Sequence, residues 1–422
     1  MIAARLSEDP ANHVVLIEAG PDLLPHGVPA AIDAPSFLAA LDLEDRLDPI
    51  VATRVAGGPA TPYRRGRGVG GSSSVNAMVA LRGAPELYRS WRWDDTDAAW
   101  EMLALPVEPP ADHEIGPVDR ALLAADPSAT VAELTRRHGR RVTAAEAYLW
   151  PARGRANLEV RAGVPVDRVA LDGRRAVGVV LADGEEVSAS RVVLAAGAIR
   201  SPWLLLRSGV DTAGIGDGLQ DHPSAVLTLQ LRAGRAADPA SLVIGSLSRR
   251  GAIQFLPMNH LGPQAPGLGA VLVALMTPRS AAGTVRVADD GDPLVDFALL
   301  ADPADLDALS QGVGQAIELL RTPAFVDLVA QVYVDSSGTP VDALGDVGAI
   351  RAWLPTVVGD YVHASSTCAM GVVVDDDAAV FGYERLHVAD ASVFPSIPDV
   401  NTHLPTTMLA ERLCARWRRR ST

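Results

Sequence analysis

Short apolar runs bounded by turn-forming or acidic residues mark the first half of this chain. Val14–Ile17 is followed at once by Glu18 and Gly20, and Val192–Ile199 ends in small residues. Such runs are typical of buried strands in a parallel sheet. In a dinucleotide-binding βαβ unit, an acidic residue at the end of the second strand accepts hydrogen bonds from the ribose hydroxyls. The pattern therefore predicts an α/β nucleotide-binding fold with Glu18 as the ribose ligand.

Three helices are predicted around these strands. Met1–Asp9 has the pattern of the end of an amphipathic helix. Ser201-Pro202 predicts a helix start, with serine as the cap and proline in the first turn. Leu404-Pro405 predicts a second start, for a helix that runs to Arg416.

Other segments alternate or form apolar runs typical of antiparallel strands. Residues 157–200 predict a meander that returns to the nucleotide sheet, and residues 224–354 predict an antiparallel sheet covered by helices. The predicted strands of the meander are 158–160, 166–169 and 177–181; those of the second region are 226–231, 270–276 and 283–287, with helices at 303–320 and 347–354.

Composition limits the possible functions. The 422 residues are enough for two domains with full cores, and the formal net charge of −14 argues against nucleic acid and anionic membranes as partners. No apolar run approaches the roughly 18 residues that a transmembrane helix needs. The sequence contains no lysine, which excludes Schiff-base and P-loop chemistry, and two cysteines make neither a disulfide framework nor a metal site.

A glycine-rich segment between Arg65 and Met78 carries the clearest chemical signal. Its glycines let the backbone approach a ligand closely, and the serines and amides that follow can donate hydrogen bonds to a phosphate. A glycine-rich surface loop without a ligand is the alternative.

This segment, Gly-Arg-Gly-Val-Gly-Gly-Ser-Ser-Ser-Val-Asn-Ala-Met, resembles the first signature of the glucose–methanol–choline (GMC) family of FAD-dependent oxidoreductases. Ala-Ala-Gly-Ala-Ile-Arg-Ser-Pro at 195–202 resembles the second signature, and Leu-Gln-Asp-His-Pro at 219–223 resembles the junction where the chain leaves the FAD domain. The resemblance implies a three-layer, Rossmann-like FAD-binding domain with an α+β substrate domain. Because the first segment has no histidine, it also implies non-covalent FAD.

The resemblance implies FAD contacts from several parts of the chain, and the segments 1–90, 151–223 and 355–422 would together form the FAD domain. Residues 91–150 would be a reduced lid and 224–354 the substrate domain. The implied FAD-contacting residues are Glu18, Arg67, Gly70, Gly71, Ser72, Asn76, Val166, Ala196, Gly197, Asp390, Ala391 and Thr402.

The C-terminal part resembles the catalytic motifs of the family. Tyr-Val-His-Ala-Ser-Ser-Thr-Cys-Ala-Met-Gly implies that His363 is the base that takes the alcohol proton while hydride moves to flavin N5. The family's second catalytic position corresponds to His403, with Asn401 as the less favoured partner. We expect His222 to be structural and Cys368 to serve packing.

The N-terminus departs from the family pattern. The strand and Gly-x-Gly-x-x-Gly turn that should precede the first helix are absent from the sequence. We expect a truncation of on the order of 20–30 residues; the alternative is a degenerate protein that truly starts at Met1. The sequence does not decide whether this chain retains FAD.

The leading function is oxidation of a small-molecule alcohol by an FAD enzyme, with the electron acceptor left undetermined among oxygen, a quinone and a redox carrier. The compact lid favours the mycofactocin-associated subfamily as a specific identity. A hydroxynitrile-lyase-like enzyme and a non-catalytic remnant are the alternatives. A cytoplasmic location is expected, with peripheral membrane association and export left open by the N-terminus.

Overall fold

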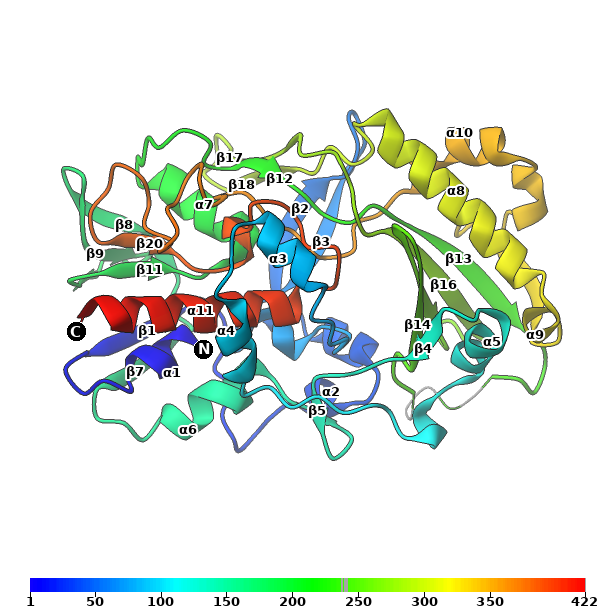
Figure 1. The fold of residues 1–422 in the computed structure, drawn as a ribbon, viewed down its shortest axis with the longest axis horizontal. Coiled ribbons are helices and arrows are strands. Elements are labelled where there is room, and N and C mark those ends of the chain that lie inside the picture. The colour runs from blue at the N-terminus through cyan, green and yellow to red at the C-terminus, as the bar shows by residue number, and fades with distance from the viewer. Residues whose placement is uncertain (237, 239–241, 422) are drawn as a thin grey trace.

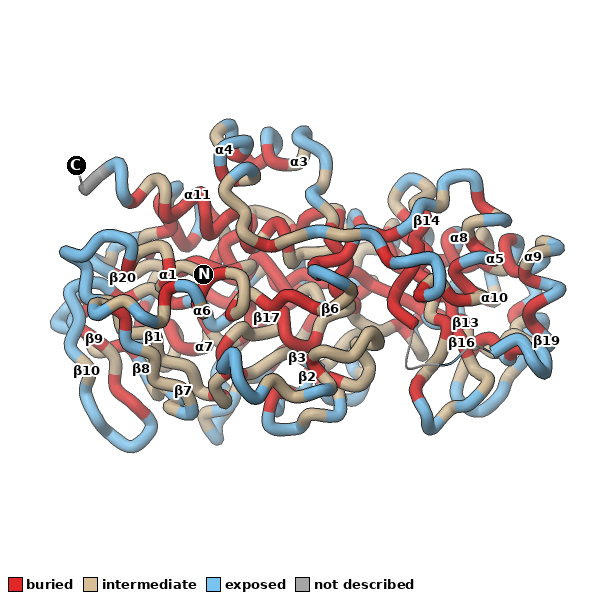
Figure 2. The backbone as a smooth tube through the Cα atoms, turned by 90° about the horizontal axis from the view of Figure 1, so that it is seen from below, coloured by how far each residue is buried: buried red, intermediate tan, exposed pale blue. Residues whose placement is uncertain are grey.

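The computed structural model describes residues 1–236, 238 and 242–421 as an elongated molecule (Figure 1). Both chain ends lie in one half, together with short parallel strands and the helix α11, His403–Ser421. The other half contains a larger antiparallel sheet and the helix α8, Pro303–Leu320. Buried backbone runs through the middle of the molecule between the two halves (Figure 2).

The first half contains two parallel strand pairs. β1 (Val14–Glu18) pairs with β7 (Leu158–Ala162), and β11 (Val192–Leu194) pairs with β20 (Leu386–Val388). The predicted meander contains β8 (Val166–Asp172), β9 (Arg175–Leu181) and β10 (Glu186–Ser188). β7 was expected in this meander and lies beside β1 instead. An alternating pattern shows which faces of a strand are buried but does not identify its partner.

Three helices pack together in this half of the molecule. α1 (Ile2–Leu6) and α4 (Thr96–Glu101) both pack against α11. Arg5 of α1 donates to the fully buried carboxylate of Glu411 at 2.7–3.1 Å. This ion pair fixes the N-terminal segment to α11, whose first residue is His403.

The helix after β11 starts earlier than the sequence predicts. α7 spans Gly197–Arg207, so Pro202 lies inside it and Ser201 is not its cap. Gly197 adopts φ +82° and turns the strand directly into the helix. Pro202 cannot donate to the carbonyl of Ala198, and the Thr367 hydroxyl donates to that carbonyl instead at 2.7 Å.

A five-stranded sheet joins the two halves. Its order is β12 (Asp217–Leu219), β17 (Gly283–Val287), β18 (Pro293–Asp296), β2 (Leu47–Thr53) and β3 (Ala60–Gly66). β17 and β18 come from the predicted substrate domain, and β2 and β3 come from the first predicted FAD segment. Strand pairing therefore crosses the predicted boundary at residue 224.

A six-stranded sheet forms the second half. Its order is β19 (Val329–Tyr333), β13 (Ser224–Leu231), β16 (Leu268–Leu275), β15 (Ile253–Met258), β14 (Ser246–Arg250) and β4 (Ala129–Val131). α8 packs on β15 and β16, and α5 (Pro117–Ala125) on β14 and β15. α10 (Val347–Val357) packs on α8, and α9 (Pro323–Val326) on α5. This half confirms the antiparallel sheet with covering helices, and α8 has the predicted bounds.

The faces of this sheet have different neighbours. Phe255, Val271 and Val273 belong to the core that includes residues of α8, whereas Leu256 and Ala274 pack in a separate apolar cluster with Tyr361. The second face therefore looks toward the segment that carries His363.

The remaining elements are short. In the described part of the chain they are α2 (Ala30–Asp33), α3 (Pro85–Ser90), α6 (Trp150–Ala152), β5 (Arg136–Arg137), β6 (Arg140–Arg141), several 3-10 turns, of which η3 (Gly71–Ser74) and η8 (Ala391–Val393) bear on the site, and a π-turn at Ala145–Leu149. Among the described residues, no helix has both the length and the apolar character that crossing a bilayer demands.

Candidate active site

The carboxylate of Asp221, directly after β12, organises the segment that carries His363. It is 1% exposed and accepts hydrogen bonds from the backbone N–H groups of Tyr361 at 3.1 Å and His363 at 2.9 and 3.0 Å. The Tyr63 hydroxyl donates to the same carboxylate at 2.9 Å. Two distant parts of the chain are therefore held together by one buried group.

The backbone between these donors is strained. Val362 adopts φ +61°, a left-handed conformation that a β-branched residue rarely takes. Its N–H donates to Asp360 at 3.1 Å, while Asp221 holds the residues on either side. The Tyr63 hydroxyl also accepts from the N–H of Ala364 at 3.0 Å. These contacts turn the chain sharply just before His363.

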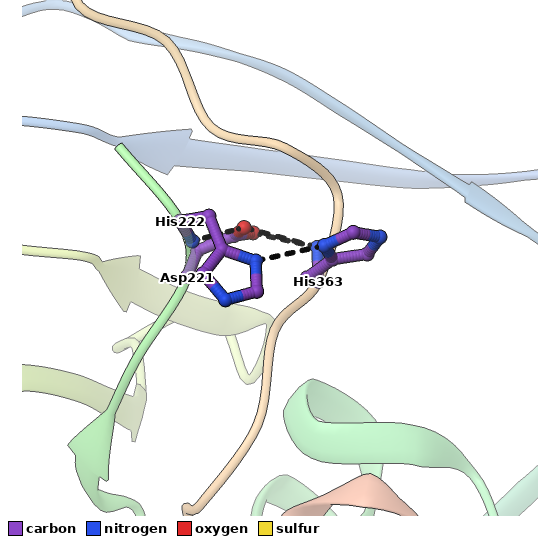
Figure 3. Close-up of side chains that lie close together, drawn as sticks. All are labelled: Asp221, His222 and His363. Carbon is purple, nitrogen blue, oxygen red and sulfur yellow. Dashed lines mark hydrogen bonds between the residues drawn. The ribbon is translucent and has the colours of Figure 1, made fainter. Parts of the chain in front are cut away.

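His222 and His363 are hydrogen-bonded to each other through their rings and form a relay (Figure 3). The second partner of His222 determines which ring nitrogens carry the protons. Nε2 of His222 lies 3.0 Å from the carbonyl oxygen of Pro398. A carbonyl only accepts, so this Nε2 carries the proton, and Nδ1 of neutral His222 has the lone pair. That Nδ1 lies 2.9 Å from Nδ1 of His363, which must therefore donate. Neutral His363 is left with its lone pair on Nε2.

Burial keeps both imidazoles neutral. Desolvation lowers the pKa of His222 to about 3. Desolvation, together with the neighbouring His222, lowers the pKa of His363 well below its usual value. At neutral pH, His363 therefore offers an unprotonated nitrogen, as a general base requires.

Asn401, and not His403, lies at this nitrogen. Nδ2 of Asn401 is 3.5 Å from Nε2 of His363, at the outer limit of a hydrogen bond. His403 is the first residue of α11, and its Nε2 is buried without a partner among the described residues. Burial and the charge of Arg141 lower the pKa of His403 to about 4. Of the two candidate partners of His363, Asn401 and His403, the contacts of His363 favour Asn401.

Asp221, His222 and His363 have the spacing of a metal site, since one ligand atom from each lies within 4.8 Å of the others. Each of these donors is already used within the protein. The carboxylate accepts from three backbone N–H groups and a tyrosine, and the two Nδ1 atoms bond to each other. The cluster is therefore better explained as a hydrogen-bond relay.

The glycine-rich segment forms a bent turn after β3. Gly70 adopts φ +99° and precedes the 3-10 turn η3. A side chain on Gly66 would collide with the carbonyl oxygen of Gly71, because its Cβ would lie 2.6 Å away, whereas a Cβ on Gly71 would meet open space. Ser72 accepts from the N–H of Gly66 at 3.1 Å, so its hydroxyl shapes the turn. The turn leaves room on the side of Gly71 for a ligand.

Glu18 at the end of β1 supports the same turn. One of its carboxylate oxygens accepts from the N–H of Gly20 at 2.8 Å and of Gly68 at 3.0 Å. Its other oxygen makes no hydrogen bond with the described residues. Arg67 donates to the carbonyl of Ala19 at 2.8 Å and so bridges the same two segments.

Asn76 follows the turn and is held by a buried arginine. Its Oδ1 accepts from Arg141 at 2.7 Å and from the N–H of Met78 at 3.1 Å. Arg141 is 2% exposed, also donates to the carbonyls of Ile32 and Ser73, and makes no ion pair in the described part of the chain. Desolvation lowers the pKa of Arg141 to about 10, so it keeps its charge at neutral pH.

The end of β11 brings together further predicted residues. Ala196 is exposed although it follows a buried strand, and Gly197 donates to Asp390 at 2.8 Å. Asp390 also accepts from Ser201 at 2.6 Å and Ser392 at 2.8 Å. Its carboxylate therefore serves the β11–α7 turn, and a cofactor contact there would fall to the backbone of residues 390–391.

Two further residues complete the expected set. Val166 begins β8 and pairs with Leu181. Thr402 directly precedes α11, and its carbonyl accepts from the N–H and the hydroxyl of Thr406 at 3.0 and 2.7 Å. Neither position makes a contact that assigns it to a cofactor.

Several buried polar atoms around the glycine-rich turn have no partner among the described residues. They are Arg46 Nη1, Ser74 Oγ, Arg141 Nη2 and His403 Nε2. Unsatisfied buried polar atoms are costly, and a phosphate-bearing, heteroaromatic ligand such as FAD offers acceptors and donors for them. The residues present therefore fit FAD.

Sequence reasoning missed the contacts of three buried polar residues. His222 was expected to be structural, and its contact with His363 spans 141 positions of sequence, so no local pattern shows it. Arg141 lies in a run of arginines that resembles an ordinary solvated surface. Gln254, which donates to the hydroxyl of Tyr361 at 2.8 Å, stands in an apolar run, and its isolated amide was the one signal available for that contact.

Comparisons with known proteins show which family this chain resembles over most of its length. Two family models, both described as GMC oxidoreductase, match residues 50–105 with 117–224 and residues 278–410. The chain is 30% identical to 5-(hydroxymethyl)furfural oxidase of Methylovorus sp. (strain MP688), with 98% of this chain and 95% of that protein covered.

Pyridoxine 4-oxidase is similar in both sequence and structure. The enzyme of Microbacterium luteolum is 28% identical, with 97% of this chain and 96% of that protein covered. The crystal structure of pyridoxine 4-oxidase from Mesorbium loti superposes with a TM-score of 0.88 at 26% identity, covering 99% of this chain and 96% of that chain.

Proposed function

The chain belongs to the GMC oxidoreductase family, whose cofactor is FAD, and we propose that it oxidises an alcohol at His363. The relay from Pro398 through His222 carries this proposal, because it leaves the Nε2 lone pair of His363 facing Asn401. The names of the two relatives refer to oxidation of 5-(hydroxymethyl)furfural and of pyridoxine, which supports an alcohol as the substrate.

His363 acts as the general base in this proposal. Its Nε2 accepts the hydroxyl proton of the alcohol, and its Nδ1–H stays donated to His222. The proton arrives on a half-buried imidazole whose pKa is lowered by desolvation, so the positive charge forms only as the proton leaves the alcohol. FAD, when bound, supplies the hydride acceptor.

Asn401 is the second group at the reacting oxygen. Its long 3.5 Å contact with His363 leaves space for a substrate hydroxyl, and its Nδ2 can donate to that oxygen. This assignment replaces the pairing of His363 with His403 that the sequence favoured. His403 is proposed to serve the cofactor wall, beside Arg141 and the glycine-rich turn.

The FAD-holding residues are proposed from position. Glu18 would accept from the ribose, the amides and serines of residues 70–74 would hold the pyrophosphate, and Asn76 and α11 would face the flavin ring. Arg67, Val166, Ala196, Gly197, Asp390, Ala391 and Thr402 remain proposed contacts. The domain boundaries, the mycofactocin-associated subfamily, the N-terminal truncation and the cytoplasmic location remain predictions from the sequence.

Anaerobic flavin reduction tests the proposal. Protein reconstituted with FAD is mixed with 5-(hydroxymethyl)furfural, pyridoxine and simple primary alcohols, and loss of the oxidised flavin spectrum is followed by stopped flow. We expect bleaching, and we expect His363→Gln to slow it about 10²–10⁴-fold because the base is lost. Asn401→Ala should slow it more than His403→Gln does.

His260→Gln is the matched control, since His260 is a half-buried histidine outside the relay. A flavin that no alcohol bleaches would support the lyase alternative, and failure to bind FAD would support the remnant. Unimpaired bleaching in His363→Gln would overturn the assignment of the base.

A further inference from the structure

Gln254 is a buried amide on the sheet face that looks toward His363. It lies on β15 opposite Ala274 of β16 and is 1% exposed. Its neighbours two positions along β15 and across the sheet, Leu256 and Ala274, pack in an apolar cluster with Met276 and Tyr361. Burying a primary amide among apolar side chains is unfavourable unless its hydrogen bonds are satisfied.

Only half of this amide is satisfied within the described chain. Nε2 donates to the Tyr361 hydroxyl at 2.8 Å, whereas Oε1 is buried without a partner. Rotating the amide by a half turn does not remove the deficit, because Oε1 would then accept from the tyrosine and Nε2 would be left unpaired. In either orientation, Gln254 needs one more polar group.

Tyr361 lies between the unpaired amide of Gln254 and the proposed base His363. Its ring packs edge-on against the ring of His363, with centroids 4.8 Å apart and an interplanar angle of 85°. Nδ2 of Asn401 lies 3.5 Å from Nε2 of the same histidine, and Oδ1 of Asn401 is a second buried atom without a described partner. The unpaired end of Gln254 therefore lies one aromatic ring away from His363, the residue that Asn401 also contacts.

We infer that Gln254 and Tyr361 form a subsite for a second hydroxyl group on the alcohol substrate. The inference rests on the proposed function and adds a substrate class to it. A hydroxyl both donates and accepts, so it satisfies Gln254 in either amide orientation. The surrounding Leu256, Ala274 and Met276 require an apolar body between the two hydroxyls. The substrate is therefore a diol with a hydrocarbon or aryl spacer.

A second glutamine provides the control. Gln315 on α8 also has a buried Oε1 without a described partner, but α8 covers the opposite face of the sheet. Gln254→Met and Gln315→Met make the same chemical change at similar volume. Only the first removes a group on the face of His363.

The test compares 1,4-benzenedimethanol with 4-ethylbenzyl alcohol, which differ by one hydroxyl in place of one methyl. A second pair, 1,6-hexanediol and 1-heptanol, repeats the comparison on a flexible spacer. Affinity is measured by thermal shift of the FAD-bound protein without oxygen, and flavin reduction is measured by stopped flow. We expect the wild type to bind and oxidise one or both diols at least tenfold better than their monohydroxy partners.

Gln254→Met should abolish this preference while the reduction rate with the monohydroxy alcohols stays within about threefold, and Gln315→Met should keep it. Tyr361→Phe should weaken the preference, because it removes the partner that orients the amide. Equal affinity for both members of each pair in the wild type, or a preference that survives Gln254→Met, would overturn the subsite. A diol preference in binding without flavin reduction would refute the proposed oxidation and leave the subsite standing.

Discussion

Two regions satisfy their buried polar groups in opposite ways. The catalytic junction comprises Asp221, His222 and residues 361–364, and the cofactor wall comprises Arg141, His403 and the glycine-rich turn at residues 66–74. At the junction, Asp221 accepts from two distant chain segments, and His222 is bonded at both ring nitrogens. At the wall, Arg141 and His403 each keep a buried nitrogen without a described partner. The first region is organised by the protein itself, and we propose that a ligand completes the second. Changes at the junction should therefore cost folding stability, and changes at the wall should cost cofactor affinity.

Of the changes considered, Asp221→Ala should lower the free energy of unfolding the most. The substitution leaves the buried N–H groups of His222, Tyr361 and His363 without an acceptor, each at a cost of about 1–3 kcal/mol. We expect the free energy of unfolding, measured in urea, to fall by about 3–5 kcal/mol. Asp217→Ala, at an exposed ion pair with Arg286, should change it by less than about 1 kcal/mol. Similar losses in both variants would refute the special role of Asp221.

Arg141→Met should weaken FAD binding at the cofactor wall. The guanidinium is buried, has an unpartnered nitrogen and makes no ion pair with a described residue, so an anionic ligand is its expected partner. We expect FAD affinity, measured by fluorescence titration, to fall at least tenfold, about 1.4 kcal/mol.

Arg140 offers the matched control for this change. It is the neighbouring residue but is partly exposed and bonds to Asp33 and Glu146. Arg140→Met should leave the affinity nearly unchanged, and Arg141→Lys should restore part of it. An Arg141→Met variant that binds FAD as tightly as the wild type would show that the wall does not need this charge.

The pH dependence of stability should show that His222 at the junction is buried in its neutral form. His222 has a pKa of about 3 when folded and roughly 6.5 when unfolded, so below pH 6.5 the unfolded chain takes up a proton that the folded chain does not. Its contribution makes stability fall as the pH drops from 6.5 toward 3, by up to about 1.4 kcal/mol per pH unit. His222→Gln should remove the uptake of this one proton on unfolding and so make the dependence of stability on pH less steep. His26→Gln, at an exposed position, should leave that dependence unchanged. An unchanged slope in His222→Gln would contradict a neutral, buried His222.

Val362→Gly should have the smallest effect, and it should be stabilising. Glycine adopts the left-handed backbone of this position without the strain that valine carries. We expect a gain of up to about 1 kcal/mol in the free energy of unfolding. Val226→Gly, in the extended strand β13, should lose about 0.5–1 kcal/mol. A loss of stability at both positions would mean that Val362 is not strained.

The same contrast explains what could be predicted from the sequence. The cofactor wall is built from local runs, so the glycine-rich turn, Glu18 at the end of β1 and the small residues after β11 could be identified by pattern. The bounds of α8 could be predicted because its apolar period is regular and Asp302 caps it, accepting from the N–H of Ala304.

The junction depends on contacts between distant segments and could be predicted only in part. A histidine in the motif around residue 363 was expected, but its contact with His222 was not, because no local pattern encodes it. The choice between Asn401 and His403 depended on where α11 begins. His403 is already the first helical residue, so its side chain follows the helix, while Asn401 stays in the preceding loop beside His363. The predicted start at Leu404 and the observed start at His403 differ by one residue, and a difference of that size is beyond what a sequence pattern resolves.

The protonation of His363 tests the central claim most directly. Histidine ring nitrogens labelled with ¹⁵N can be observed by NMR in the wild type and assigned with the His363→Gln variant. We expect His363 at pH 7 to be neutral, with a proton on Nδ1 and a pyridine-like, unprotonated Nε2, and His222 to be neutral with its proton on Nε2. A proton on Nε2 of His363, or a charged His363 at pH 7, would contradict its role as the base that receives the alcohol proton.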